Sequence, residues 1–141
     1  MEENRNDVLK DASSLELARA TVAILIEKKA LNVKMYELLE KSPITDYYVN
    51  VTGRSSTNVM ALADEVAYQV GLLGVEPDHT EGRDGKAWVL VDYGDVIVNV
   101  FDRESRDFYN LDRLMPEDSE IDISDIVADV DKKLDINNRE V

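Results

Sequence analysis

The chain has 141 residues, of which 44% are hydrophobic, so it can form one folded domain with a sizeable core. Thirty acidic residues outnumber sixteen basic ones and give a net charge of −14, which should repel bare nucleic acid and anionic lipid. There is no cysteine and only one histidine, which excludes disulfides, thiol chemistry and multi-histidine metal sites.

Targeting and membrane signals are missing from the sequence. No apolar run approaches the roughly 18 residues of a membrane span, and the polar, acidic first residues resemble neither a secretory signal nor a transit peptide. We therefore expect a cytoplasmic protein that binds no membrane and makes no direct contact with nucleic acid. If it works near RNA, a basic protein must hold it there.

The first predicted helix spans residues 13–29 and follows a polar segment, residues 1–12, that we expect to be a flexible N-terminus. Ser13 and Glu16 have the spacing of a capping box. A helical period is followed by Leu17, Thr21, Ile24, Leu25 and Lys28.

Two strands are predicted next, at residues 31–38 and 46–52, separated by a break that contains Pro43. Gly53 then leads into a second helix that Ser55 or Ser56 can cap. Gly74 suits the left-handed position after its end. The apolar stripe of this helix is Val59, Leu62, Ala63, Val66, Val70 and Leu73.

Residues 86–101 predict a β-hairpin whose loop is Gly94-Asp95, because this loop pairs Asp92 with Ile97 and keeps Asp92 from facing Asp95. Side chains alternate between the two faces of a strand. One face, expected to be core, carries Val89, Val91, Tyr93, Val96, Val98 and Val100. The other is mixed, and is either covered by a helix or a docking surface; it carries Trp88, Leu90, Asp92, Ile97, Asn99 and Phe101.

The remaining segments complete an α/β domain. Residues 75–81 are a short strand candidate weakened by Pro77, and Asp102 can cap a helix that runs to Met115 before Pro116. Residues 116–141 are predicted to be a mostly solvated acidic tail with a possible amphipathic helix on the stripe Ile123, Val127, Val130 and Leu134. Together these elements predict a single mixed sheet of about five strands flanked by helices.

Two segments are candidates for catalytic or metal chemistry. Residues 53–57 resemble the Gly-Ser turn of nucleotidyltransferases, but those enzymes bind metal with carboxylates two residues apart on a neighbouring strand. Here Asp92 and Asp95 are three apart across a turn, so the catalytic carboxylate pair is missing. We interpret residues 53–57 as a serine-capped turn, and Asp92 and Asp95 as turn-shaping groups, with Mg²⁺ binding as the alternative.

His79 and Trp88 are open to two interpretations each. His79 lies near Glu81, as an acid–base pair would, but no serine nucleophile or second organised carboxylate accompanies it, so we interpret it as a surface residue. Trp88 is either a core residue or a binding hot spot, since tryptophan is enriched in both places.

Between residues 13 and 115, several short motifs occur in a defined order. They are Thr45-Asp46-Tyr47-Tyr48-Val49, Thr52-Gly53-x-Ser55, Ala61-x-Ala63-Asp64-Glu65, Gly74-Val75-Glu76-Pro77, Glu81-Gly82, Trp88-Val89-Leu90-x-Asp92-Tyr93-Gly94-Asp95, Val100-Phe101 and Arg106-x-Phe108-Tyr109-x-Leu111. Each motif alone is weak, but their order and spacing together resemble the ribosomal silencing factor family RsfS, also called Iojap-like.

The resemblance implies a nucleotidyltransferase-like fold over residues 13–115 without enzymatic activity, cofactor or metal. It implies binding to the large ribosomal subunit at its fourteenth protein in the bacterial numbering. That contact would block joining of the small subunit and repress translation under nutrient limitation. The partner-binding residues implied here are Trp88, Asp92, Tyr93 and Asp95.

The chain departs from the family pattern at Asn99, where many members have histidine, and at Met115, where many have tryptophan. Its acidic segment after Pro116 is also longer than in compact members. The alternative function is a divergent metal-dependent nucleotidyltransferase or phosphohydrolase that uses Asp92 and Asp95. A third possibility is an acidic adaptor that binds through its tail, and an apolar strand face would allow a homodimer.

Overall fold

The computed structural model describes the backbone of residues 7–139 and the side chains of residues 7–136. Within these limits six strands form one open sheet in the order β3-β4-β5-β2-β1-β6. The strands are β1 (Leu31–Glu37), β2 (Tyr47–Thr52), β3 (His79–Glu81), β4 (Trp88–Asp92), β5 (Val96–Phe101) and β6 (Glu120–Ile121). β2 and β5 run parallel, and the other neighbouring strands pair antiparallel. The predicted α/β class with one mixed sheet is thus confirmed.

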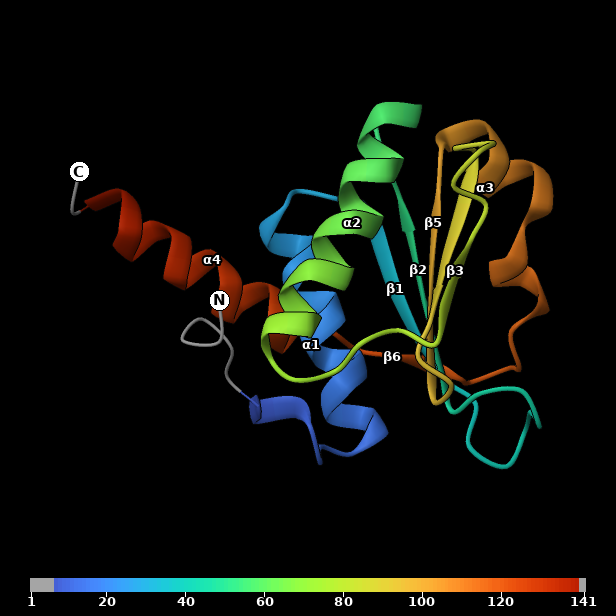
Figure 1. Cartoon of the computed structure of the whole chain (residues 1–141), viewed down its shortest axis with the longest axis horizontal. Helices are drawn as coiled ribbons and strands as arrows, with labels where there is room; N and C mark the ends of the chain where they lie inside the picture. Colours follow the sequence, from blue (N-terminus) through green and yellow to red (C-terminus); the bar gives the residue numbers. More distant parts are fainter. Residues whose placement is uncertain (1–6, 140–141) are drawn as a thin grey trace.

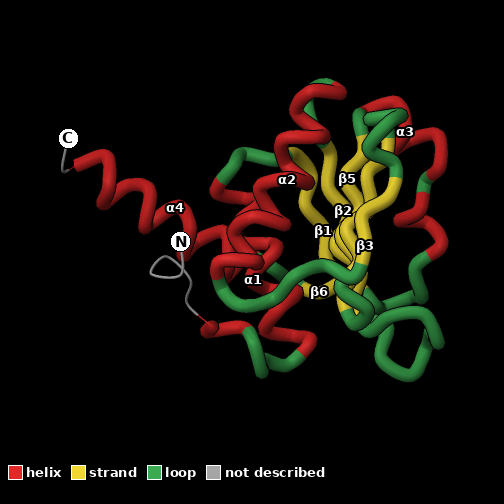
Figure 2. The backbone as a smooth tube through the Cα atoms, in the orientation of Figure 1, coloured by secondary structure: helices red, strands yellow, loops and turns green. Residues whose placement is uncertain are grey.

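Helices lie on both faces of the sheet. They are α1 (Ser14–Glu27), α2 (Ser56–Leu72), α3 (Arg103–Tyr109) and α4 (Ser124–Arg139), with 3-10 turns η2 (Asp7–Leu9) and η3 (Leu111–Leu114). Figure 1 shows α1 and α2 side by side on one face, with α3 and the chain that follows it on the other. The tube view in Figure 2 shows the sheet between these two layers.

Local cap chemistry sets the start of α1 and of α2. The Ser13 hydroxyl accepts from the N–H of Glu16 at 3.2 Å, and the Ser55 hydroxyl accepts from the N–H of Asn58 at 3.0 Å. Beyond α2, Gly74 has φ +103°, a left-handed conformation that favours glycine. The caps at Ser13 and Ser55 and the helix end at Gly74 are therefore confirmed.

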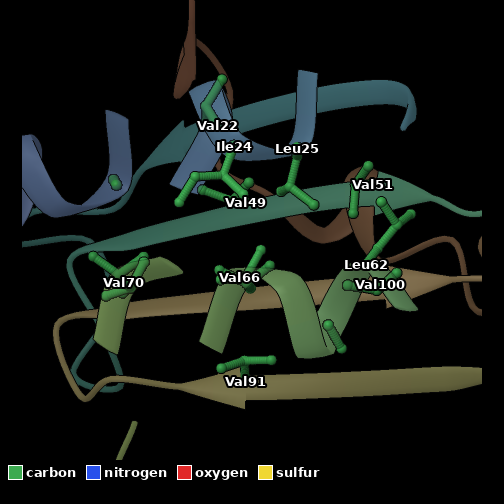
Figure 3. Close-up of a cluster of buried hydrophobic side chains, with 14 of the residues drawn as sticks. Val22, Ile24, Leu25, Val49, Val51, Leu62, Val66, Val70, Val91 and Val100 are labelled. Atoms are coloured by element: carbon green, nitrogen blue, oxygen red, sulfur yellow. The ribbon is translucent and has the colours of Figure 1, made fainter. Parts of the chain in front are cut away.

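The core lies between the sheet and the pair α1 and α2. Figure 3 shows valine, leucine and isoleucine side chains from both helices meeting those of β2, β4 and β5. The hairpin face that was predicted to be core is buried, and Val49 of β2 lies opposite Val98 with both side chains fully buried. On α1, Ala18 and Val22 are buried, whereas Lys28 at its C-terminal end is exposed.

The hairpin between β4 and β5 has the predicted Gly94-Asp95 loop. Asp92 lies opposite Ile97, and the N–H of Tyr93 donates to the carbonyl of Val96 at 2.9 Å. The Asp92 carboxylate accepts from the N–H of Gly94 at 2.7 Å, as an aspartate that shapes a turn does.

Predicted and observed elements differ after β5. The helix expected to run to Met115 ends at Tyr109, because Asn110 adopts a left-handed conformation with φ +47° and its N–H bonds back to Arg106. The chain resumes as η3, and Phe108, near the end of α3, is exposed. The strand candidate at residues 75–81 is shortened to β3, which begins after Pro77.

The C-terminal segment forms the amphipathic helix that its apolar stripe allowed, and it packs on the domain while most of its described charged side chains stay exposed. β6 pairs with β1, with Met35 opposite Ile121, and α4 contacts α1 through the buried Ile126 and Val130. Arg19 and Asp125 add an ion pair between the two helices. In Figure 1 α4 starts beside α1 and projects away from the sheet.

The predicted flexible N-terminus lies partly outside the described residues, which begin at Asp7. Residues 7–9 form η2, where Leu9 is buried and its N–H donates to the carbonyl of Leu73 at 2.8 Å. Within residues 7–139, none of the helices has the length and apolar character that crossing a membrane requires.

Candidate protein-docking surface

The sheet face opposite α1 and α2 combines large apolar and polar side chains, and we call it the mixed face. Its residues follow from the strand register, because aligned partners project to the same side. Successive rows across β4, β5 and β2 are Trp88, Phe101 and Thr52; Leu90, Asn99 and Asn50; and Asp92, Ile97 and Tyr48. The segment from α3 to η3 covers part of this face and leaves Trp88, Leu90 and Asp92 partly exposed.

Four aromatic rings run from the protein interior to solvent on the mixed face, and we call them the aromatic ladder: Phe101, Trp88, Tyr109 and Phe108. The Trp88 ring centroid lies 4.9 Å from that of Phe101 and 4.9 Å from that of Tyr109, and Tyr109 lies 5.1 Å from Phe108. Phe101 is fully buried, while Tyr109 is 50% exposed and Phe108 is 78% exposed. Such an exposed aromatic series is typical of a protein-binding surface.

A chain of hydrogen bonds holds the Trp88 indole from beneath. Its Nε1–H donates to Asn99 Oδ1 at 3.0 Å, the Asn99 amide donates to Asn50 Oδ1 at 3.1 Å, and the Asn50 amide donates to Asp112 Oδ1 at 3.0 Å. Asn99 and Asn50 are fully buried, and an amide buried without hydrogen-bond partners would destabilise the fold, so these bonds satisfy both side chains. The Trp88 N–H is therefore engaged inside the protein, and the ring is held in one orientation.

Asp112 is the end point of this chain and the centre of a polar network. Arg106 donates through Nε to Asp112 Oδ2 at 2.6 Å and through Nη2 to Oδ1 at 3.2 Å, and the Tyr36 hydroxyl donates to Oδ1 at 2.9 Å. Arg106 also donates through Nη1 to Thr52 Oγ1 at 2.9 Å. The network thus ties the segment from α3 to η3 onto β1 and β2.

Burial and hydrogen bonding act in opposite directions on the ionisation of Asp112. Burial favours its neutral form, but hydrogen bonds from Arg106, Asn50 and Tyr36 outweigh this effect and hold the pKa of the carboxyl below its usual value. For Tyr36, burial and the hydrogen bond to Asp112 both raise the pKa of the phenol. Asp112 is therefore a carboxylate, and Tyr36 a neutral donor, at physiological pH.

The structure brings two of the four predicted partner-binding residues onto one face. Trp88 and Asp92 share the mixed face, and Asp95 is exposed at the hairpin loop, where its carbonyl accepts from the N–H groups of Asp46 and Tyr47 at 3.1 Å. Tyr93 points to the core side and is only 8% exposed. Burial raises the pKa of its phenol, and its hydroxyl has no hydrogen-bond partner among the described residues.

Residues 53–57, which resemble a catalytic turn, have structural contacts in the fold. The Ser55 hydroxyl caps α2, and a Cβ added to Gly53 would lie 2.9 Å from Val59 Cγ2, so Gly53 allows the close approach of α2. His79 Nε2 lies 2.7 Å from a Glu81 oxygen and 3.5 Å from Asp92 Oδ2. Among the side chains described, no group of three or more carboxylates or histidines could hold a metal ion.

The outer part of this surface, formed by Phe108 and Tyr109, was not predicted from the sequence. Phe108 and Tyr109 belong to the motif at residues 106–111, but the helix expected to run to Met115 gave no indication that both rings would be exposed. Leu114 of η3 is exposed as well. The available signal was Asn110, a residue type that readily adopts the left-handed conformation and ends a helix.

The sequence model of the family described as ribosomal silencing factor during starvation, RsfS, matches residues 11–140. The ribosomal silencing factor RsfS of Halalkalibacterium halodurans is 31% identical over 82% of this chain and 99% of that protein. A crystal structure of a Chromobacterium violaceum protein matches 73% of this chain and 86% of its own, with 28% identity and a TM-score of 0.71. A more distant mouse relative, named mitochondrial assembly of ribosomal large subunit protein 1, is 25% identical over 66% of this chain and 42% of its own length. The chain therefore belongs to the RsfS family of ribosomal silencing factors.

Proposed function

We propose that this protein binds the large ribosomal subunit through the mixed face, at the fourteenth protein of that subunit. Binding there blocks joining of the small subunit and represses translation under nutrient limitation. The observation that carries the proposal is the aromatic ladder, in which a tryptophan fixed by an internal hydrogen bond is continued by two exposed rings. The names of the relatives, which refer to ribosomal silencing and to assembly of the ribosomal large subunit, support the choice of particle.

The aromatic ladder has the properties of a binding hot spot. A ring held in one rotamer loses little entropy on binding, and a tryptophan in a desolvated interface contributes about 2 kcal/mol or more, or about thirtyfold in affinity. Trp88 is fixed by Asn99 and by its neighbours Phe101 and Tyr109. These contacts make Trp88 the anchor of the proposed interface.

The acidic character of the chain determines what kind of partner fits. With a net charge of −14, the protein is repelled by the RNA of the ribosome and attracted by basic protein surfaces. Asp92 on the mixed face and the exposed Asp95 in the adjoining hairpin loop bring two acidic residues to this end of the sheet. Tyr93, which is buried behind the loop, supports these residues from the core side and has no direct contact with the partner in this proposal.

Two side chains on which the enzymatic alternative depends, Ser55 and Asp92, make structural hydrogen bonds. The Ser55 hydroxyl accepts the capping bond of α2, and the Asp92 carboxylate accepts the turn bond from Gly94. Ser55 and Asp92, which a nucleotidyltransferase-like site would use, therefore both have structural partners in the fold.

A subunit-joining assay tests the proposal. Purified large and small subunits are mixed with the protein, and the joined particle is quantified by sedimentation in a sucrose gradient. The parent protein should reduce joining, and Trp88→Glu should remove this effect, because it places a carboxylate in the centre of the interface. Phe108→Glu, at a 78% exposed position that can change without loss of folding, should weaken the effect as well.

Tyr68→Glu is the matched control, since Tyr68 is a 62% exposed aromatic residue on α2, on the far side of the sheet from Trp88. It should block joining like the parent protein. Thermal melting of each variant shows whether the domain is folded. A folded Trp88→Glu variant that still blocks joining would contradict the proposal, and so would a parent protein that leaves joining unchanged.

A further inference from the structure

A hollow of about 240 Å³ lies directly beside Trp88. It is smaller than the hollow of about 340 Å³ between α1 and α4. The smaller hollow is lined by Glu81, Gly82, Trp88 and Leu90. Glu81 is aligned with Leu90 across β3 and β4, and Trp88 is two residues before Leu90 on the same strand, so all three side chains project onto the mixed face. The hollow is thus a continuation of the proposed docking surface.

Gly82 shapes one end of this hollow. Its φ of +86° favours glycine, and a Cβ added there would lie 2.0 Å from the backbone oxygen of Trp88. The backbone after β3 can therefore pass close to the start of β4 without a side chain between them. This close approach leaves the Trp88 ring and Leu90 to form the apolar wall.

The chemistry of the lining favours a long cationic side chain. Trp88 and Leu90 offer an apolar wall, and the exposed Glu81 supplies a carboxylate at the rim. Because the Trp88 N–H is already bonded to Asn99, the indole presents only its apolar ring, and an aromatic ring attracts cations. Asp92 lies one row further along the same face and adds a second negative charge. His79 lies between these two carboxylates and contacts both.

We propose that this hollow receives a lysine or arginine side chain of the large-subunit protein. The aliphatic stem packs on Leu90 and Trp88, and the charged end lies at Glu81. This inference rests on the proposed function, and it adds the chemical class of the residue that the partner presents. An apolar side chain in the hollow is the competing occupant.

The test measures the affinity of variants for purified large ribosomal subunits. Glu81→Gln keeps the size of the side chain and removes its charge, and it should weaken binding by about fivefold or more. Asp129→Asn removes one charge from an exposed position on α4 and is the matched control, expected to stay within twofold of the parent. Equal weakening by the two variants would show general charge attraction and overturn the inference.

Trp88→Glu in the same assay separates the inference from the proposed function. If Glu81→Gln binds like the parent while Trp88→Glu does not bind, the docking surface holds and the cation subsite is overturned. If folded Trp88→Glu also binds like the parent, the proposed function fails together with the inference.

A direct readout uses the indole N–H resonance, which belongs to Trp88 alone because the chain has one tryptophan. Nα-acetyl-lysine methylamide, which keeps its charged side-chain amine, is titrated into the protein at millimolar concentration. A separate titration uses Nα-acetyl-norleucine methylamide, which has a similar stem without the charge. In the parent, the lysine compound should shift the resonance more than the norleucine compound does. In Glu81→Gln, the two compounds should shift it equally. Equal shifts in the parent would establish an apolar occupant and overturn the inference.

Discussion

Replacing Asp112 with alanine tests the network that supports the docking surface. The substitution removes the acceptor for Arg106, Asn50 and Tyr36 at once. Arg106 is only 6% exposed, so its charge would be left without a counter-ion in a nearly dry place. Breaking a buried ion pair in this way costs about 3–5 kcal/mol.

The exposure of Asp112 indicates that the loss of unfolding free energy lies at the lower end of this range. The side chain of Asp112 is 22% exposed, so water can enter the vacated space and solvate part of the guanidinium. We therefore expect Asp112→Ala to lower the free energy of unfolding by about 3 kcal/mol. For a chain of this size, that loss corresponds to a decrease in Tm of roughly 12 °C.

Denaturant unfolding followed by circular dichroism measures this loss. Asp107→Ala is the control, because Asp107 is an exposed aspartate on α3, and its removal should change stability by no more than about 0.5 kcal/mol. The double variant Arg106→Met with Asp112→Leu should recover part of the loss, since it leaves no unpaired charge. A loss below about 1 kcal/mol for Asp112→Ala, or one equal to that of Asp107→Ala, would refute this account of the network.

The core, the Asp112 carboxylate and the charge of the chain can each be perturbed separately. Val98→Ala should cost about 1–3 kcal/mol, because Val98 is fully buried, and an unchanged unfolding midpoint would contradict its place in the core. The fold lowers the pKa of Asp112 below 3.8, so the stability that its carboxylate contributes is present above that pH and is lost as the pH falls through the lower pKa of the folded state. Acid should therefore lower the free energy of unfolding more steeply in the parent than in Asp112→Ala. Parallel plots of unfolding free energy against pH for the two proteins would argue against this. Added salt should slow association with large subunits more than it speeds dissociation, since exposed charges are screened beyond about 8 Å, and a salt-independent association rate would exclude electrostatic steering.

Features set by short-range chemistry could be predicted from the sequence. Ser13 and Ser55 mark the starts of their helices because a hydroxyl there satisfies a free N–H three residues on. Gly94 identified the hairpin loop, and the alternation of side chains placed Tyr93 on the core side. The resemblance implied a partner contact for the same Tyr93, which is only 8% exposed.

Features that depend on distant residues could not be predicted in this way. Asp112 meets Asn50 and Tyr36, which are 62 and 76 positions away, and nothing local indicates these contacts. The apolar stripe indicated a possible helix in the C-terminal segment, but the pairing of β6 with β1 and the packing of α4 on α1 depend on distant residues and could not be predicted. The aromatic ladder depends on where α3 ends, and the left-handed conformation of Asn110 sets that end.

We propose that this protein docks on the large ribosomal subunit through the mixed face. The most direct measurement is co-sedimentation of the tagged protein with purified large subunits and, separately, with purified small subunits. We predict that the parent and Tyr68→Glu pellet with large subunits and stay in the supernatant with small ones, and that folded Trp88→Glu stays in the supernatant with both. A parent protein that pellets equally with both subunits, or a folded Trp88→Glu variant that pellets with large subunits like the parent, would contradict the claim.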